Sequence, residues 1–338
     1  MKRMRLAVIG VGYLGRIHAR LARDFPGWQL CGVVDPQPQA RQAVQTELGV
    51  PAYGDLSALA GQVDAAIVAT PSATHYTVAS QLLRQGVHLL VEKPLTLNVG
   101  DAQDLIHLAD QHQCVLHVGH VERFNPALVA LRPHLPRPEL VLAQRVGSFT
   151  GRSLDVGAVL DLMIHDLDVV LAFVAAPVVS VDAVGIPVLS ASEDIANARL
   201  RFANGCVANL TASRVSAERL RKIRVFSSAP EPAYVSLDYR AQAGYLYRLA
   251  RADEPSSSLF KKLLAARDST VVSEFGGKRI VREPVPITRE EPLKLELRSF
   301  VDCVLARRQP VVSGEAAKRA LDLAFEITRQ IRAGLSRA

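Results

Sequence analysis

The stretch Arg5-Leu-Ala-Val-Ile-Gly-Val-Gly-Tyr-Leu-Gly15 decides the fold class of this chain. It opens with a short apolar run, which is typical of a buried strand. Three glycines follow with the spacing Gly10-x-Gly12-x-x-Gly15, where helical periodicity begins. Glycine at the first two positions lets the backbone turn tightly and approach a pyrophosphate, whose charge the helix N-terminus stabilises. The stretch therefore predicts the strand, turn and helix of a dinucleotide-binding domain.

An acidic residue downstream indicates which cofactor is bound. Asp35 lies 20 residues after Gly15, at the end of the second apolar run. A carboxylate at this place accepts hydrogen bonds from ribose hydroxyls and repels a 2′-phosphate, so the sequence favours NAD over NADP. The alternative is a glycine-rich turn in which Asp35, followed by proline, only caps the next helix.

The first 120 residues alternate short apolar runs with segments of helical periodicity. We expect strands at 5–9, 29–34, 65–69, 88–91 and 115–118. We expect helices between them at 13–24, 38–48, 75–85 and 99–112. This alternation predicts a parallel sheet covered on both faces, with the carboxyl ends of its strands along one ligand-binding edge.

The pattern changes after Arg123. A helical segment at 158–174 precedes strand-like runs, which we expect at 178–186, 196–202, 206–213, 222–227 and 233–238. Asn204-Gly205 predicts a hairpin because these residues tolerate a positive φ. Segment 251–277 is rich in charge, Ser and Gly and is expected to be a loop or poorly ordered, and helices return at 293–306 and 314–331.

The predicted fold class is α/β, with an N-terminal Rossmann doubly wound parallel sheet and a C-terminal α+β domain on a largely antiparallel sheet. We expect residues 1–121 to bind NAD. Residues 122–338, including the C-terminal helices, are expected to bind substrate and to mediate oligomerisation. An exposed sheet face usually serves as an interface, so we expect a homo-oligomer, a dimer or tetramer, formed through the second sheet.

Composition excludes several classes of protein. Hydrophobic residues make up 49% and charged residues 22% of the 338, as in ordinary globular proteins, and we expect no transmembrane helix. The net charge of +7 suits an anionic ligand, but 5% aromatic residues and the lack of a nucleic-acid-binding motif argue against nucleic acid. Four scattered cysteines indicate neither a disulfide framework nor a zinc site, which fits a cytoplasmic protein.

Asp161 and His165 are the candidate catalytic pair of the second domain. They lie four residues apart in a helical segment, so their side chains share one face. A carboxylate can orient an imidazole in this way, and histidine suits proton transfer near neutral pH. The alternative is that these residues, with Asp166 and Asp168, form a polar helix face without chemistry. We find no additional ligand set at a suitable spacing, so we expect no metal.

Three motifs together resemble the Gfo/Idh/MocA oxidoreductases. They are the glycine turn at 10–15, Ala69-Thr70-Pro71 with His75, and Glu92-Lys93-Pro94. The resemblance covers nearly the whole chain, because 291–314 also looks like the C-terminal helical ending of that family. It implies a Rossmann domain that carries NAD(P), a second sheet domain, and hydride transfer at a sugar or cyclitol carbinol.

The resemblance also implies roles for individual residues. Lys93 would reach both cofactor and substrate, although on its own it would be interpreted as a solvated lysine at a strand end. The Lys93–Pro94 bond is expected to be cis. The acid/base pattern Asp-x-Gly-x-His is matched by Asp161 and His165, with Met163 in place of Gly, and the family leaves open whether Lys93 or His165 is the base. The residues expected at the cofactor are Gly10, Gly12, Tyr13, Leu14, Gly15, Asp35, Thr70, Pro71, His75, Glu92 and Lys93.

Substrate-binding candidates begin where the first domain passes to the second. We expect His120, Arg123 and Asn125 to face the interdomain cleft, although a linker with a Pro-capped helix would have the same sequence. Arg214 and the basic residues after it can bind a phosphate or diphosphate, or can be the basic residues of a sheet edge. The runs 156–168 and 211–214 resemble family members that oxidise the 3-hydroxyl of a nucleotide sugar, on the route to a 3-amino sugar of lipid A.

Two alternatives are consistent with the same sequence. The substrate can be a free sugar, inositol or sugar acid instead of a nucleotide sugar. The protein can also be a non-catalytic NAD-binding regulator, because a fold does not imply a function. The presence of Lys93, Asp161 and His165 together favours an NAD-dependent oxidoreductase that acts on CH–OH groups.

Overall fold

The computed structural model describes residues 3–134, 137–149, 151, 156–251 and 270–336. It divides into two compact units. Unit 1 contains Met1–Val121 and Glu291–Asp322, and unit 2 contains Glu122–Glu290 and Leu323–Ala338. The chain therefore returns to unit 1 after it has formed most of unit 2.

Unit 1 is built on a parallel sheet. Its described residues form six strands in the order β3-β2-β1-β4-β5-β6. The strands are β1 (Met4–Ile9), β2 (Trp28–Val34), β3 (Ala52–Tyr53), β4 (Ala65–Val68), β5 (His88–Glu92) and β6 (Leu116–Gly119). This order is that of a doubly wound dinucleotide-binding sheet, which confirms the predicted Rossmann fold. In such sheets ligands bind at the carboxyl ends of the strands where the order reverses, which here are β1 and β4.

Local signals explain where the helices of unit 1 begin and end. They are α1 (Tyr13–Arg23), α2 (Pro38–Leu48), α3 (His75–Arg84) and α4 (Val99–Gln111), with short 3₁₀ turns η1 (Leu56–Leu59) and η2 (Ser72–Thr74). Proline at the first position suits the start of α2, which ends at Gly49 with a φ of +68°. The Asn98 side chain caps α4 by accepting a 2.8 Å hydrogen bond from Asp101 N–H.

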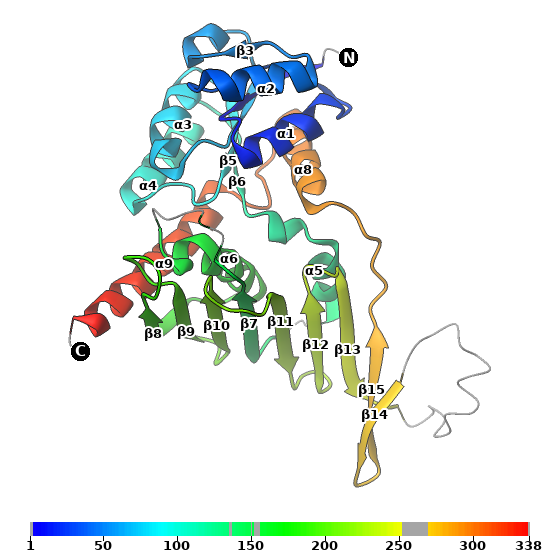
Figure 1. Ribbon diagram of the computed structural model, residues 1–338. Coiled ribbons are helices and arrows are strands. Elements are labelled where there is room, and N and C mark those ends of the chain that lie inside the picture. Colours follow the sequence, from blue (N-terminus) through cyan, green and yellow to red (C-terminus); the bar gives the residue numbers. More distant parts are fainter. Residues whose placement is uncertain (1–2, 135–136, 150, 152–155, 252–269, 337–338) are drawn as a thin grey trace. The chain divides into compact units, whose positions relative to one another are not determined.

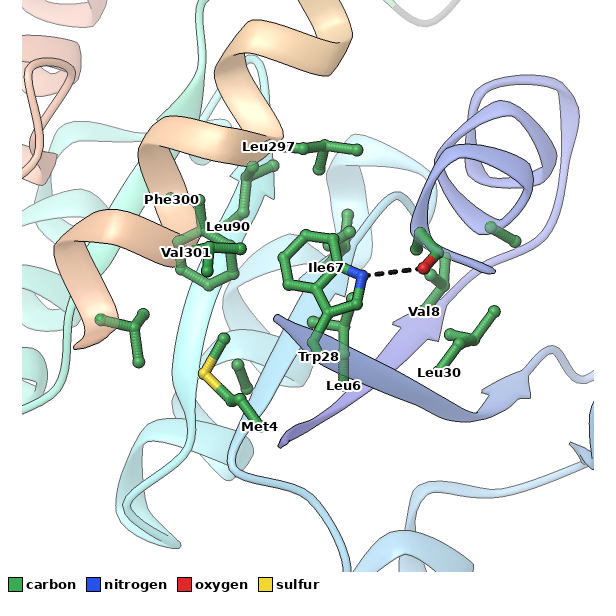
Figure 2. Close-up of a cluster of buried hydrophobic side chains, with 14 of the residues drawn as sticks. Met4, Leu6, Val8, Trp28, Leu30, Ile67, Leu90, Leu297, Phe300 and Val301 are labelled. Carbon is green, nitrogen blue, oxygen red and sulfur yellow. Dashed lines mark hydrogen bonds between the residues drawn. The ribbon is translucent and has the colours of Figure 1, made fainter. Parts of the chain in front are cut away.

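The core of unit 1 includes a helix from the end of the chain. Figure 2 shows Trp28 among apolar side chains of the sheet, where its indole N–H donates a 2.8 Å hydrogen bond to the Ala22 carbonyl. Leu297 and Phe300 of α8 (Pro292–Ala306) belong to the same cluster and are fully buried. The sequence placed this helix in the second domain. The structure places it in unit 1, because its apolar face completes this core.

Unit 2 is built on a large, mostly antiparallel sheet. In its described part, nine strands follow the order β14-β15-β13-β12-β11-β7-β10-β9-β8. Only β7 and β10 pair in parallel among them. The strands are β7 (Leu140–Val146), β8 (Val178–Ile186), β9 (Ile195–Phe202), β10 (Val207–Ser213), β11 (Leu220–Ser227), β12 (Ala233–Asp238), β13 (Ala243–Leu249), β14 (Thr270–Phe275) and β15 (Lys278–Pro284). The predicted α+β domain is confirmed.

Helices of the described residues pack on one face of the unit 2 sheet (Figure 1). The helical elements are η3 (Val121–Phe124), α5 (Pro126–Leu131), η4 (Arg132–His134), η5 (Val159–Met163) and α6 (Ile164–Phe173), and α9 (Gly314–Leu335) runs from unit 1 into unit 2. Strand residues alternate between the buried face and a half-exposed face, which we call the open face. On the open face the rings of Phe226, Tyr234 and Tyr247 stack across three strands, with centroids 5.0 and 4.1 Å apart.

Some elements of unit 2 differ from the expectation. The β9–β10 hairpin is confirmed, with Gly205 at a φ of +88°. Strands β7, β13 and β15 were not predicted from the sequence. Part of the expected loop at 251–277 is strand β14, which pairs with β15, while 252–269 lie outside the described residues. These strands were missed because charged and polar residues interrupt their apolar alternation.

None of the helices in the described residues combines the length and the hydropathy that crossing a membrane requires. The 22-residue helix α9 carries charged side chains along its length. All four cysteines lie in described parts of the chain and have free thiols.

Candidate active site

The glycine turn between β1 and α1 is shaped by the packing of its own backbone. Gly10 has a φ of +83°, and a Cβ there would lie 2.7 Å from the Ala69 carbonyl oxygen. A Cβ at Gly15 would lie 1.8 Å from the Gly10 carbonyl oxygen, so only glycine lets the helix approach the turn. Gly12 differs, because no described atom lies within 4 Å of a Cβ at that position. Space is therefore left directly before the first residue of α1.

The N-terminus of α1 has the properties of an anion site. Its N-cap residue Gly12 has no side chain to bond the first backbone N–H groups, and the first helical turn carries no acidic residue. The partial positive charge of the helix end is thus available to an anion from outside the chain. Together with the space at Gly12, this end of the helix fits the pyrophosphate of NAD.

Asp35 follows β2 and holds the glycine turn in place. Its Oδ2 accepts a 2.9 Å hydrogen bond from Val11 N–H, and its Oδ1 accepts a 2.8 Å bond from Gln37 N–H. The side chain is buried, yet each carboxylate oxygen can accept one more hydrogen bond. Asp35 therefore fits the expected ribose contact and also caps the turn before α2, so the two interpretations are compatible.

The end of β5 carries the Glu92-Lys93-Pro94 motif, and its Lys93–Pro94 bond is cis, as expected. Glu92 is 7% exposed. Its Oε1 lies 2.6 Å from His18 Nε2, and its Oε2 accepts a 3.3 Å hydrogen bond from Lys93 N–H. Lys93 itself is half-buried. His18 was not predicted from the sequence, although it is the one histidine on a face of α1 that otherwise carries glycine and alanine.

His75 joins the turn after β4 to the turn after β5. Its Nδ1 lies 2.8 Å from the Pro94 carbonyl oxygen and its Nε2 lies 2.9 Å from the Thr70 carbonyl oxygen. The ring is 1% exposed, and both nitrogens are occupied by these contacts. His75 therefore positions the turn that contains Thr70 and Pro71, whereas the sequence suggested that it contacts the cofactor directly.

In unit 2 the Asp161–His165 pair lies where a π-helical turn passes into an α-helix. Asp161 belongs to η5 and His165 to α6, and both side chains are half-buried. Met163 between them is fully buried. Glu193 holds the start of this helix by accepting a 3.2 Å hydrogen bond from Val159 N–H. Short π-helical turns within α-helices occur frequently at functional sites.

The alternative of one polar helix face does not match the structure. Asp166 and Asp168 are each 2% exposed and lie on the buried side of α6. Asp168 forms an ion pair with Arg123, with Oδ1 and Nη1 3.4 Å apart. Asp161 and His165 are thus more exposed than Asp166 and Asp168 of the same helical segment.

A buried ionic cluster beneath α6 was missed by the sequence analysis. Arg145 of β7 is 3% exposed and binds both Asp166 oxygens, at 2.9 and 3.0 Å, and Glu122 Oε1 at 2.9 Å. Burial alone would lower the pKa of Arg145, but the two carboxylates raise it above its ordinary value. The Arg145 guanidinium also lies over the Tyr239 ring, 5.5 Å from its centroid. An arginine at an inward position of an alternating strand was the available signal.

The expected substrate residues have different surroundings. Arg123 is half-buried beside Asp168. His120 in unit 1 is 1% exposed. Asn125 is 2% exposed, caps α5 by accepting a 3.1 Å hydrogen bond from Ala127 N–H, and donates to the Tyr239 carbonyl at 3.2 Å. Asn125 therefore builds the framework of unit 2, as the alternative of a Pro-capped helix required.

Arg214 is the largest departure from the expected site. Its Nε donates a 2.7 Å hydrogen bond to Asp194 Oδ1, and its other nitrogens donate to the Val156 carbonyl and the Ser190 hydroxyl at 2.9 and 2.8 Å. It is 6% exposed. The structure thus gives Arg214 a framework role instead of the expected contact with a diphosphate, because its guanidinium is used inside the chain.

Each unit therefore brings together part of the expected site. Unit 1 gathers the glycine turn, Asp35 and the Glu92–Lys93 turn at the carboxyl edge of its sheet, and unit 2 presents Asp161 and His165 on one helix. In the parts of the chain that the structure describes, no group of three or more His, Cys, Asp or Glu side chains is placed to hold a metal ion.

The fold and the glycine turn define a protein that binds a dinucleotide through a Rossmann domain and carries a second domain on a mostly antiparallel sheet. Family models agree. The oxidoreductase family model with an NAD-binding Rossmann fold matches residues 4–120, and the Gfo/Idh/MocA C-terminal domain matches residues 128–229. The chain belongs to the Gfo/Idh/MocA family of oxidoreductases, and its cofactor is NAD.

Individual relatives match along the whole chain. The chain is 35% identical over 338 residues, covering 100% of both sequences, to a UDP-N-acetylglucosamine 3-dehydrogenase of Acidithiobacillus ferrooxidans. A solved structure of that enzyme matches with a TM-score of 0.86 over 98% of this chain and 99% of the other, at 34% identity. A scyllo-inositol 2-dehydrogenase (NAD(+)) of Bacillus subtilis is 25% identical over 98% of this chain and 95% of its own.

Proposed function

We propose that this protein oxidises the 3-hydroxyl of UDP-N-acetylglucosamine to a ketone with NAD as hydride acceptor. The observation that carries the proposal is the 35% identity to an enzyme of that name over the full length of both chains. This match includes both units, which carry the proposed substrate-recognition residues His120 and Arg123. The B. subtilis relative supports the runner-up, a dehydrogenase of a free cyclitol or sugar, through a lower identity over nearly the same length.

The residues proposed to hold NAD belong to unit 1. The α1 N-terminus at Gly12 would bind the pyrophosphate and Asp35 the adenosine ribose. When bound, NAD accepts the hydride from the carbinol carbon. The remaining proposed contacts come from Gly10, Tyr13, Leu14, Gly15, Thr70, Pro71, Glu92 and Lys93.

In the proposed mechanism, proton removal falls to this chain's own side chains. His165, oriented by Asp161, would accept the proton of the sugar hydroxyl as the C–O bond becomes a carbonyl. Lys93 would donate a hydrogen bond to the same oxygen and stabilise its developing negative charge. Lys93 is also a candidate base. The proton passes to the base and the two electrons leave with the hydride, so the carbinol is oxidised by two electrons.

Recognition of the substrate is proposed for the half-buried Arg123 and for His120. Arg123 is more accessible than Arg214, which makes it the stronger candidate for an anionic group of a nucleotide sugar. A 3-keto product would suit an aminotransferase, and a 3-amino sugar for lipid A is the proposed use of the product. We place the reaction in the cytoplasm, which supplies NAD and keeps thiols reduced.

We propose that the open face of the unit 2 sheet forms a homo-oligomer. The stacked rings of Phe226, Tyr234 and Tyr247 give this face aromatic area that a partner can cover. Light scattering at micromolar concentration should give a dimer or tetramer. A monomer there would contradict the proposal, and Tyr234→Lys should favour the monomer.

The first experiment follows reduced-nicotinamide absorbance after NAD is mixed with UDP-N-acetylglucosamine or with a panel of free sugars and inositols. Reduction with the nucleotide sugar alone, lost in Lys93→Ala and retained in the control His107→Ala, supports the proposal. His107 is an exposed histidine on α4. Reduction with a free sugar or inositol only would replace the proposed substrate by the runner-up.

A further inference from the structure

A buried histidine of the pyrophosphate-binding helix contacts the carboxylate of the Glu92-Lys93 motif. His18 is 0% exposed and sits in the middle of α1, whose N-terminus begins at the glycine turn. Its Nε2 lies 2.6 Å from Glu92 Oε1, across 74 residues of sequence. This contact joins two segments that the proposed NAD site uses separately.

The Glu92 carboxylate is fixed from three sides. His18 contacts Oε1, and Lys93 N–H donates to Oε2 at 3.3 Å. On the third side lies Gly119 of the neighbouring strand β6, where a Cβ would come within 2.8 Å of Oε2. Glycine at 119 therefore makes room for the carboxylate. The arrangement leaves Glu92 little freedom, and with it the backbone that carries Lys93.

The hydrogen bonding of His18 indicates where its proton is. Its Nδ1 is buried and has no hydrogen-bond partner among the residues that the structure describes. A buried N–H without an acceptor is costlier than a bare lone pair. The geometry therefore assigns the proton to Nε2, which donates it to Glu92. The imidazole on α1 thus donates a hydrogen bond to the Glu92 carboxylate at the end of β5.

We propose that His18 is a positioning residue that couples the pyrophosphate-binding turn to the Glu92–Lys93 turn. When α1 is held by an anion at its N-terminus, His18 holds Glu92, and Glu92 holds the Lys93 backbone. A role in packing alone would not need a polar side chain here, because the buried face of α1 otherwise carries only glycine and alanine. The inference rests on the NAD site and not on the identity of the sugar.

The test measures NADH affinity by titration calorimetry in the absence of any substrate. His18→Leu fills the space but removes the donor, whereas His18→Gln retains an N–H group at a similar reach. We expect His18→Leu to raise the Kd for NADH about tenfold, and His18→Gln to restore it to within about threefold of the wild type, since the bond to be lost involves a buried charged group. Trp28→Phe is the matched control, because it removes a buried hydrogen bond to the same helix away from the turn.

The outcomes separate positioning from packing. An unchanged Kd in His18→Leu, with a loss of thermal stability like that of Trp28→Phe, would overturn the proposal. If His18→Leu does not fold, Gly119→Ala disturbs the same carboxylate from the opposite side and should weaken NADH binding with His18 intact. Normal NADH affinity in that variant would also contradict it. Because no sugar is present, failure of the proposed substrate leaves this test unaffected.

Discussion

Both units bury carboxylates close to their candidate sites, but the partners of these carboxylates differ. In unit 1, Glu92 is held by one imidazole and one backbone N–H and remains 7% exposed. In unit 2, Asp166 is bound through both oxygens by Arg145, which also binds Glu122. Asp166 is 2% exposed and its charge is balanced by the buried Arg145, so it serves the framework of unit 2, whereas Glu92 belongs to the candidate site of unit 1.

The largest expected effect tests whether the two units contribute different functions. His165→Ala should lower kcat about 10²- to 10⁴-fold, because a general base is lost, and should leave the Kd for NADH unchanged. Lys93→Ala should lower kcat comparably and also weaken NADH binding. Steady-state kinetics and calorimetry on the same preparations measure both. If His165→Ala abolished NADH binding, the division of roles between the units would be wrong.

The next largest effect is expected from removing the cation of the buried ionic cluster. Arg145→Met leaves Asp166 and Glu122 buried without their cation and should destabilise the protein by about 3–5 kcal/mol. Denaturant unfolding monitored by circular dichroism measures this loss. Arg199→Met is the control, because Arg199 is exposed and, among the described residues, its side chain donates to Asn209 at 3.1 Å. A small change in Arg145→Met would show that the cluster does not stabilise unit 2.

Two glycines of the same turn should behave differently. Gly10→Ala places a Cβ against the Ala69 carbonyl at a φ of +83°, so we expect a stability loss of about 1–3 kcal/mol. Gly12→Ala meets no described atom within 4 Å, and should change stability by less than about 1 kcal/mol while it weakens NADH binding at the pyrophosphate position. Thermal unfolding and calorimetry distinguish the two, and equal affinities for Gly12→Ala and wild type would contradict the cofactor role.

Two further expected effects concern the dependence of stability on pH. Burial, with His120 nearby, lowers the pKa of His117 in unit 1 to about 3. As the pH falls, the unfolded chain therefore binds a proton at His117 at a higher pH than the folded chain does. The contribution of neutral His117 to the free energy of unfolding is complete above about pH 6.5 and is lost progressively as the pH falls towards 3. His117→Gln should reduce the loss of thermal stability between about pH 7 and about pH 5.

In unit 2 the stability contribution of Asp194 should change at a lower pH than that of His117. Burial acts to raise the pKa of Asp194, but hydrogen bonds from backbone N–H groups and from Arg214 lower it below its ordinary value. Its contribution to stability is present above about pH 4 and is lost as the pH falls further. Asp194→Asn should therefore cost stability at neutral pH and leave less acid dependence below about pH 4. If the pH dependence of thermal stability were unaltered in both His117→Gln and Asp194→Asn, the acid sensitivity would belong to other groups.

Most of unit 1 could be predicted from sequence because its signals are local. The helix at 38–48 is reproduced residue for residue as α2, since proline at its start and Gly49 at its end mark both boundaries. The two-residue strand β3 was missed because so short a run has no period. The position of α8 was missed for another reason. Its apolar face is visible in the sequence, but the sheet that the face covers is a matter of long-range packing.

The sequence by itself determined the glycine turn, the acidic residue after β2, the Glu92-Lys93-Pro94 motif and the four-residue spacing of Asp161 and His165, because each is a short pattern with a geometric cause. Only the tertiary structure decided that His18 contacts Glu92, that Arg145 binds Asp166, and that Arg214 binds Asp194. These pairs are 74, 21 and 20 residues apart in sequence. A charged side chain takes whichever partner the fold brings within reach, and sequence spacing does not specify that partner.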